Sequence, residues 1–195
     1  MNDEITVMPV TDAPWDDVRT IFGTRGDPST CWCQFFKQPY SEFSSTSAKE
    51  KCGLLEQQVG ADGPAPGVVA YLNGEPVGWC AVEPRIHYGR LRTTKVVSQG
   101  SREDWDDATV WAVTCFVVRV GFRKRGVSRA LLDGAVEHAR KNGARIIEGY
   151  PVDVQARAKV SAAELYYGPL SLFEKAGFKI VARPTSGRAV VVLEG

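Results

Sequence analysis

The stretch that decides the fold is CFVVRVGFRKRGVSRALL, residues 115–132. Its first third is apolar and rich in β-branched residues, which is typical of a buried strand, and its last third has the apolar spacing of an amphipathic helix. Four basic side chains surround the junction: Arg123, Lys124, Arg125 and Arg129. The first turn of a helix presents backbone N–H groups without intrahelical partners, and Gly126 lets a ligand approach them. The junction therefore predicts a polyphosphate site.

The sequence on either side of this junction predicts alternating strands and helices. We expect strands at residues 5–10, 68–72, 77–82, 108–118 and 145–152, helices from about 12 to 22 and at 44–59, 126–142 and 169–176, and a closing hairpin at 178–193. Residues 23–39 read as an irregular aromatic loop and residues 84–107 as polar and mixed. The resulting order, β-α-α-β-β-β-α-β-α-β-β, indicates one mixed α/β domain over residues 1–195, with residues 108–118 at the centre of the sheet.

Composition excludes several classes of protein. The chain has 195 residues, of which 44% are hydrophobic and 24% charged, as in soluble globular domains. Its 24 basic and 23 acidic residues leave a net charge of +1, which is too small to attract nucleic acid or an anionic membrane over the whole surface, so we expect neither partner. The acidic start lacks the regions of a signal peptide and five cysteines suit reduced thiols, so we expect a cytoplasmic protein. Exposed strand edges permit a homodimer without requiring one.

Residues 123–128, RKRGVS, match neither the P-loop nor the Rossmann phosphate motif. They resemble the acyl-CoA pyrophosphate signature of the GNAT acetyltransferase superfamily, [QR]-x-x-G-x-[GA], with Ser128 at the last position. Downstream, IIEGYPVD (146–153) and LSLFEKAGF (170–178) resemble that family's LxLEV strand and LYEKLGF helix. The order of elements extends the resemblance over nearly the whole chain. It implies a single, mostly antiparallel mixed sheet flanked by helices, the GNAT-like acyl-CoA N-acyltransferase fold.

The resemblance also implies an activity, the transfer of an acetyl group from acetyl-CoA to a primary amine of a small molecule or peptide. In the family, the strand before the signature offers its backbone edge to pantetheine, and the signature cradles the pyrophosphate. Carried over, the edge belongs to Phe116 and Val118, and the cradle to Arg123, Lys124, Arg125, Gly126, Val127, Ser128 and Arg129. The family's first helix connection walls the acceptor site, which assigns that wall to Trp32, Phe35 and Phe36, with core packing as the alternative.

Acyl transfer needs a proton acceptor for the amine and a proton donor for the leaving thiolate. Glu148 matches the Glu of the LEV strand that serves as general base in some family members; the alternative is a structural Glu that bonds backbone or an Arg. Glu83, at the end of a hairpin strand, is a rival base, with a solvated strand end as its alternative. The family's helix Tyr is Phe173 here, so Tyr166 and Tyr167 are candidates for the acid role, against simple packing.

Other chemistries fit the residues less well. Cys115 as a nucleophile would allow a two-step route, but a buried Cys is usually inert, so we expect direct transfer. Cys31, Cys33 and Cys52 lack metal-ligand spacing, and we expect no metal. Two further hypotheses remain: a GNAT-like domain that senses acyl-CoA without chemistry, which Phe173 favours, and nucleic-acid binding through the basic cluster, which the balanced charge disfavours.

Overall fold

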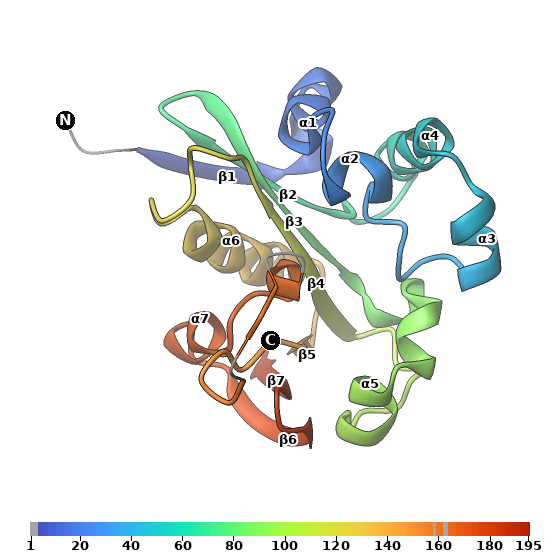
Figure 1. The fold of residues 1–195 in the computed structure, drawn as a ribbon, viewed down its shortest axis with the longest axis vertical. Coiled ribbons are helices and arrows are strands. Elements are labelled where there is room, and N and C mark those ends of the chain that lie inside the picture. The colour runs from blue at the N-terminus through green and yellow to red at the C-terminus, as the bar shows by residue number, and fades with distance from the viewer. Residues whose placement is uncertain (1–3, 158, 162–163) are drawn as a thin grey trace.

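The computed structural model describes residues 4–157, 159–161 and 164–195. Seven strands form one sheet in the order β1-β2-β3-β4-β5-β7-β6 (Figure 1). The strands are β1 Ile5–Pro9, β2 Gly67–Leu72, β3 Glu75–Pro84, β4 Val110–Val118, β5 Ile146–Gly149, β6 Lys179–Thr185 and β7 Arg188–Glu194. Only β4 and β5 pair in parallel; the other neighbours are antiparallel. The mixed, mostly antiparallel sheet is confirmed, and β4 lies at its centre as its apolar run predicts.

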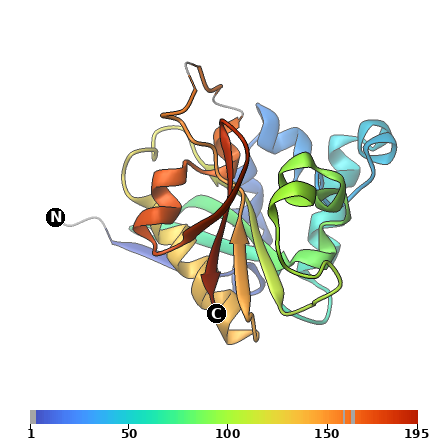
Figure 2. The same cartoon turned by 90° about the horizontal axis from the view of Figure 1, so that it is seen from below.

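Helices cover both faces of the sheet (Figure 2). They are α1 Trp15–Phe22, α2 Asp27–Cys31, α3 Tyr40–Ser45, α4 Ala48–Val59, α5 Lys95–Gly100, α6 Val127–Lys141 and α7 Leu170–Lys175, with short 3-10 helices at Val10–Asp12, Arg85–His87, Gly89–Thr93 and Glu164–Tyr167. α6 and α7 pack on one face, and α1, α4 and α5 on the other. The second face is the one that carries the polar groups described below.

α6 packs against the sheet closely enough to fix where its first turn lies. Its buried residues Val127, Leu131 and Ala135 follow the helical spacing seen in the sequence. Gly78 on β3 faces them, and a Cβ built there would lie 2.9 Å from side-chain atoms of both Leu131 and Val127. A larger residue at position 78 would push the N-terminal half of α6 away from the sheet. The position of the first turn of α6 therefore depends on this glycine.

The structure differs from the sequence prediction in four segments. The expected helix 44–59 is two helices, because Ser47 starts α4 with a capping box: its Oγ accepts from the Glu50 N–H at 3.2 Å, and the Glu50 carboxylate accepts from the Ser47 N–H at 2.7 Å. Residues 23–39 contain α2, and residues 84–107 contain two 3-10 helices and α5. The expected strand 145–152 is continuous only over Ile146–Gly149, and Val152 forms isolated bridges to Pro169 and Arg188.

Candidate active site

The sheet opens between β4 and β5. The two strands pair only from Val110 to Val113 and from Ile146 to Gly149. Beyond Val113, this edge of β4 pairs with no strand of the described part of the chain, and the segment Glu164–Tyr167 lies beside it instead. Phe116 and Val118, the predicted pantetheine contacts, both lie along this open part. An extended ligand can therefore reach backbone groups at the middle of the sheet.

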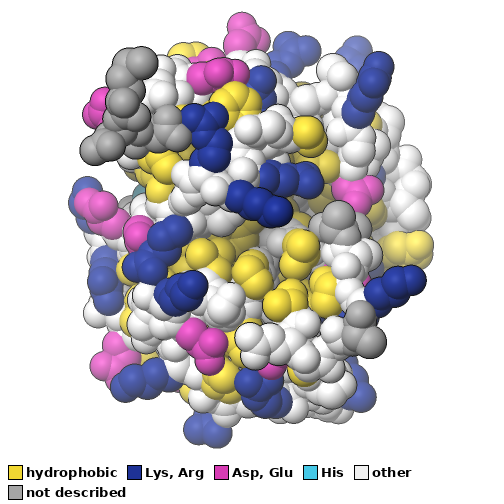
Figure 3. Space-filling view, turned by 60° about the vertical axis from the view of Figure 1, so that its left-hand side comes forward, with side chains coloured by type: hydrophobic (Ala, Val, Ile, Leu, Met, Phe, Trp, Pro, Cys, Tyr) yellow, Lys and Arg dark blue, Asp and Glu magenta, His cyan; other side chains and the backbone are white. Residues whose placement is uncertain are grey.

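The open edge of β4 leads to the basic turn before α6. Gly126 has a left-handed backbone (φ 83°), and the first helical bonds of α6 run from the Arg129 and Ala130 N–H groups to the Gly126 carbonyl. The N–H groups of Val127 and Ser128 therefore precede any helical acceptor and are directed out of the helix end. Figure 3 shows this side of the molecule, where Lys and Arg side chains rim an apolar hollow. This geometry suits an anion with an apolar tail.

The basic residues of the turn are not equivalent. Arg123 and Lys124 are exposed, and the guanidinium of Arg125 lies 5.8 Å from the centre of the Phe122 ring. Arg129 instead forms a two-pronged ion pair with Asp133, at 2.9 and 2.8 Å from its Nε, and donates to the Lys175 carbonyl. Arg129 thus holds the start of α6 against α7, whereas the side chains of Arg123, Lys124 and Arg125 are exposed.

An extra residue on β4 turns two side chains toward the opposite face. Ala81 pairs with Cys115 but Val82 pairs with Val113, so Thr114 has no partner of its own on β3. Such a bulge breaks the alternation of side chains, and Thr114 and Cys115 both leave the α6 face. The bulge lies directly after Val113, where β4 and β5 stop pairing. An extended ligand lying along the open edge of β4 would therefore meet, at this bulge, side chains from the other face of the sheet.

Two buried carboxylates flank the central strand close to this point. Glu83 on β3 and Glu148 on β5 both pair with Ala112 on β4, so the three residues form one row across the sheet. Residues in register share a face, and strands lie about 4.8 Å apart, so the two carboxylates point the same way from positions about 10 Å apart. Sequence reasoning selected both residues, and the fold places them together.

Glu83 lies near the surface with two ionisable partners. Its Oε2 is 2.5 Å from the Lys37 Nζ, and its Oε1 is 3.4 Å from the His87 Nδ1. The Glu83 side chain is 9% exposed and that of Lys37 10%, whereas that of His87 is 48% exposed. Burial alone would raise the pKa of Glu83, but the contacts with His87 and Lys37 outweigh it and hold this pKa below its ordinary value. Glu83 is thus ionised at neutral pH.

Glu148 is enclosed by the segment that follows β3. Its Oε2 accepts from the Arg85 guanidinium at 3.0 Å and from the Tyr150 hydroxyl at 2.7 Å, and its Oε1 accepts from the Ser101 hydroxyl at 2.6 Å. The side chains of Arg85 and Glu148 are both fully buried. Burial and the neighbouring carboxylate raise the pKa of Tyr150 well above its ordinary value, so its hydroxyl keeps its proton. These contacts match the structural alternative for Glu148.

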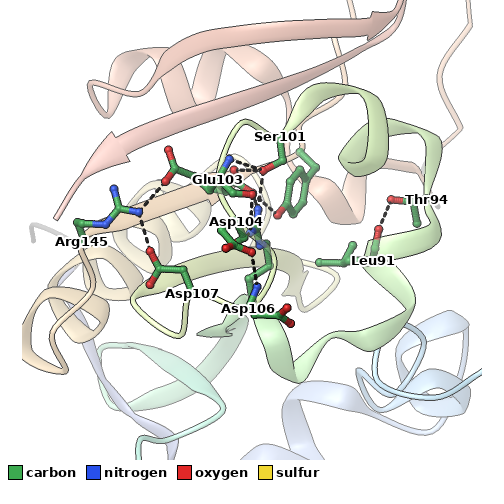
Figure 4. A network of polar contacts seen from close by, with 11 residues as sticks. Leu91, Thr94, Ser101, Glu103, Asp104, Asp106, Asp107 and Arg145 are labelled. Atoms are coloured by element: carbon green, nitrogen blue, oxygen red, sulfur yellow. Dashed lines mark hydrogen bonds and ion pairs between the residues drawn. The ribbon is translucent and has the colours of Figure 1, made fainter.

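The Arg85 guanidinium also ties the network to the loop before β4. It donates to the carbonyls of Glu103 and Asp104 at 3.1 and 2.6 Å. Figure 4 shows Ser101, Glu103 and Asp104 gathered at this point, with Arg145 bridging the carboxylates of Glu103 and Asp107 at the edge. The Arg85 to Glu148 pair therefore fixes residues 85–107 across the sheet.

The predicted acceptor wall divides into core residues and one partly exposed residue. Trp32 stacks on Phe22 with ring centres 4.7 Å apart and belongs to the core under α1. Phe36 packs instead toward Tyr166 and Tyr167, at 6.4 and 5.8 Å between ring centres. Phe35 is partly exposed and lies beneath the Arg90 guanidinium at 3.9 Å. Of the three, Trp32 and Phe36 thus take core positions, and only Phe35 is partly exposed.

Tyr166 and Tyr167 bring a protein wall to the open edge of β4. Their rings lie 4.1 Å apart between centres, and the Arg188 guanidinium lies 3.6 Å over the Tyr167 ring. Burial, together with Tyr167 and the nearby Cys115, raises the pKa of Tyr166. Tyr166 thus keeps its proton at neutral pH. A protonated hydroxyl next to the β4 bulge has the chemistry of a general acid.

The thiols of this region are poor nucleophiles. Contact with Cys33 and burial raise the pKa of Cys115 well above its ordinary value, and burial raises that of Cys31 to about 11. The thiolate is the reactive form, so both thiols are unreactive at neutral pH. Over the described residues, no group of three His, Cys, Asp or Glu side chains is placed to hold a metal ion.

Comparison with known proteins defines the family. The model of the acetyltransferase (GNAT) family matches residues 30–166, well over half of the chain. The chain belongs to the GNAT acetyltransferase family. No curated protein sequence matches it, but solved GNAT structures share its fold. A GCN5-related N-acetyltransferase from Kribbella flavida is 17% identical with a TM-score of 0.54, and the alignment covers 98% of both chains.

Two further structures agree with this GNAT fold. The putative acetyltransferase yncA from Salmonella typhimurium, solved with its cofactor acetyl-CoA, is 15% identical with a TM-score of 0.52, over 97% of this chain and 93% of that one. The GNAT domain of S. lividans PAT is 18% identical with a TM-score of 0.52, over 99% and 90%. Among the described residues of our GNAT protein, no helix is long and apolar enough to cross a membrane.

Sequence reasoning missed the partners of the two carboxylates. Lys37 and Arg85 reach them from segments that read as loop, and no local pattern links either residue to its partner. One signal was available for the third missed residue: Glu83 and His87 are four residues apart, a spacing that often brings ionisable side chains together.

Proposed function

We propose that this GNAT protein transfers the acetyl group of acetyl-CoA directly to a primary amine of a small molecule or peptide. The observation that carries the proposal is one continuous path. It runs from the basic first turn of α6, along the open edge of β4, to the bulge at Thr114 and Cys115, beside which Glu83 and Tyr166 lie. A site built only to hold acyl-CoA would need the first part of this path and not the two proton-transferring groups at its end.

The donor would be held mainly by backbone. The N–H groups of Val127 and Ser128 face outward at the end of α6, where the helix dipole favours phosphate. Arg123, Lys124 and Arg125 supply positive charge around them. Phe116 and Val118 present the backbone edge to the pantetheine amides, and Ser128 fits its position in the signature because it is small and only partly buried. Arg129 acts here through the α6 to α7 contact.

Glu83 is the better placed of the two carboxylates to remove the proton of the amine. It contacts the half-exposed His87, is ionised at neutral pH and shares the face with Thr114, whereas the Glu148 oxygens are occupied by Arg85, Ser101 and Tyr150. A base must reach the proton that it removes. We therefore assign proton removal to Glu83 and give Glu148 the structural role that the sequence analysis held as its alternative.

Tyr166 would complete the reaction by protonating the leaving thiolate. Once Glu83 has taken a proton from the ammonium, the neutral amine attacks the thioester carbon. The C–N bond forms, the C–S bond breaks and the nitrogen gives its second proton to solvent. The sulfur takes the proton of the Tyr166 hydroxyl, which solvent then restores. Burial raises the pKa of Tyr166, so its hydroxyl is protonated at neutral pH but is a weak acid. Phe173, which replaces the family's Tyr, is fully buried and packs against Phe116, so a hydroxyl on that ring is not required for this route.

Two measurements test the proposed function. Acetyl-CoA should raise the melting temperature, because it binds the folded turn and not the unfolded chain. Gly126→Glu should abolish that shift by placing charge and bulk at the phosphate turn. Gly143→Glu is the matched control, since Gly143 has the same φ of 83° just beyond the opposite end of α6. An unchanged shift in Gly126→Glu would refute the phosphate site.

A screen of primary amines for release of free CoA then separates an enzyme from a sensor. Turnover with an alkylamine, an amino acid or a peptide supports the proposed function. Binding of acetyl-CoA without turnover of any amine would favour the sensor hypothesis instead.

A further inference from the structure

The stoichiometry of the proposed reaction leaves one proton to dispose of. An alkylamine is mostly an ammonium ion at neutral pH, R–NH₃⁺, and the product amide R–NH–CO–CH₃ keeps one of its three N–H protons. One of the two that are lost is balanced by the proton that the CoA thiol gains. The other must leave the protein at every turnover. A base that is enclosed by protein therefore needs a route to solvent.

The surroundings of Glu83 offer only a few groups for that route. Lys37 is almost as buried as Glu83, and its Nζ is also held by the Gln58 Oε1 at 2.8 Å. Tyr88 is fully buried, and burial and Glu83 raise its pKa well above the ordinary value, so it does not release a proton. His138 on α6 lies on the other face of the sheet, against Trp111, and its Nε2 is 3.0 Å from the Ala65 carbonyl. None of these three side chains opens to water.

His87 differs from them in touching both Glu83 and solvent. Its Nδ1 lies 3.4 Å from the Glu83 Oε1, and nearly half of its side chain is exposed. An imidazole ring has two nitrogens, so it can take a proton on one nitrogen and release one from the other. The neighbouring Arg85, locked to Glu148, fixes the Arg85–His87 turn and with it the position of the ring.

We propose that His87 is the proton exit of this active site: it accepts from Glu83 the proton taken from the acceptor ammonium and releases it to water. The inference rests on the proposed function and on Glu83 as its base. His87 acts through Glu83 and does not touch the substrate, so it is a positioning and relay residue. No bond other than N–H and O–H changes in this step, and one proton enters the solvent per amide formed.

The test compares acceptors that differ in basicity. With an alkylammonium acceptor at pH 7, His87→Gln should slow turnover on the order of 10-fold, less than loss of the base itself. A weakly basic acceptor, such as hydroxylamine or an aromatic amine, is neutral at that pH and releases no net proton, so the same variant should leave its turnover unchanged. Ile86→Gln, an exposed neighbour in the same turn, is the control and should change neither rate.

Added imidazole gives a second readout that a structural role would not move. It should restore turnover of His87→Ala with the alkylammonium acceptor, because a free imidazole can carry the proton from Glu83. An equal loss with both kinds of acceptor, or a loss that imidazole does not reverse, would overturn the relay. If the wild-type protein acetylates no amine although acetyl-CoA raises its melting temperature, the proposed function itself fails, and that outcome is distinct from a selective failure of the variants.

Discussion

Glu83 and Glu148 occupy equivalent places on either side of Ala112, yet their surroundings differ in kind. Glu148 meets a guanidinium and two hydroxyls with no exposure, so both of its oxygens accept hydrogen bonds from the protein. Glu83 meets an ammonium on one oxygen and a half-exposed imidazole on the other. A buried carboxylate with fixed partners stabilises a structure, whereas one that borders water can exchange a proton.

The comparison also shows why position in a strand does not decide a role. Both residues end up on the same face of the sheet, next to the same residue of β4. Residues 85–107 enclose Glu148 through Arg85 and Ser101, and they place the half-exposed His87 beside Glu83. The role of each carboxylate therefore depends on how residues 85–107 contact it and not on its position in a strand.

Removing the partner of Glu148 should have the largest effect on stability. Arg85→Met leaves a buried carboxylate unpaired, and we expect a loss of about 3–5 kcal/mol in the free energy of unfolding. Urea unfolding measures it. The double variant with Glu148→Met should recover much of the loss, because both charges are then gone. Arg145→Met removes an arginine with two exposed ion pairs and should change stability little; a loss as large as that of Arg85→Met would contradict the comparison.

Removing the Lys37 ammonium from Glu83 should change how kcat depends on pH. Lys37→Met takes away an ammonium that helps to keep the pKa of Glu83 low, so this pKa should rise, and the acidic limb of kcat should move toward neutral pH. The stability that the ionised Glu83 contributes is present above its unfolded pKa and is lost as pH falls through the folded value, so the variant should also lose stability at neutral pH. Rates from pH 4 to 9 check the first point. Lys49→Met, on the exposed side of α4, should leave the limb in place.

A smaller effect is expected for the acid. Tyr166→Phe removes the hydroxyl and keeps the ring, and we expect turnover to fall on the order of 10-fold, because water can replace a weak acid in part. Tyr167→Phe keeps the ring beneath Arg188 and is the control. Equal rates in both variants and the wild-type protein would assign thiolate protonation to water and leave Glu83 as the one protein group in proton transfer.

The parts of the fold that local pattern controls were predictable from sequence. The apolar run of β4, the basic turn and the helical spacing of α6 follow one another within residues 110–141, so propensity, charge and periodicity agree there. The break between α3 and α4 was also encoded in the sequence, since Ser47 and Glu50 form a capping-box pattern.

The site was predictable in its residues and not in its roles. Glu148 lies 63 residues from Arg85 and 47 from Ser101, and nothing local announces that they meet. The bulge at Thr114 depends on how β3 and β4 align, which is a property of two strands and not of one. Long-range contacts of this kind decide whether a buried carboxylate is structural or chemical.

The most direct test is to compare Glu83→Gln with Glu148→Gln in one preparation series, measuring kcat and the free energy of unfolding for each. Both substitutions keep shape and remove charge. We expect Glu83→Gln to stay folded, to keep its acetyl-CoA thermal shift and to lose on the order of 10² to 10⁴ in kcat. Glu148→Gln should lose a few kcal/mol of stability, on the scale typical of broken buried pairs, with near-normal kcat for the folded fraction. The reverse pattern, with kcat lost in Glu148→Gln and kept in Glu83→Gln, would contradict the account.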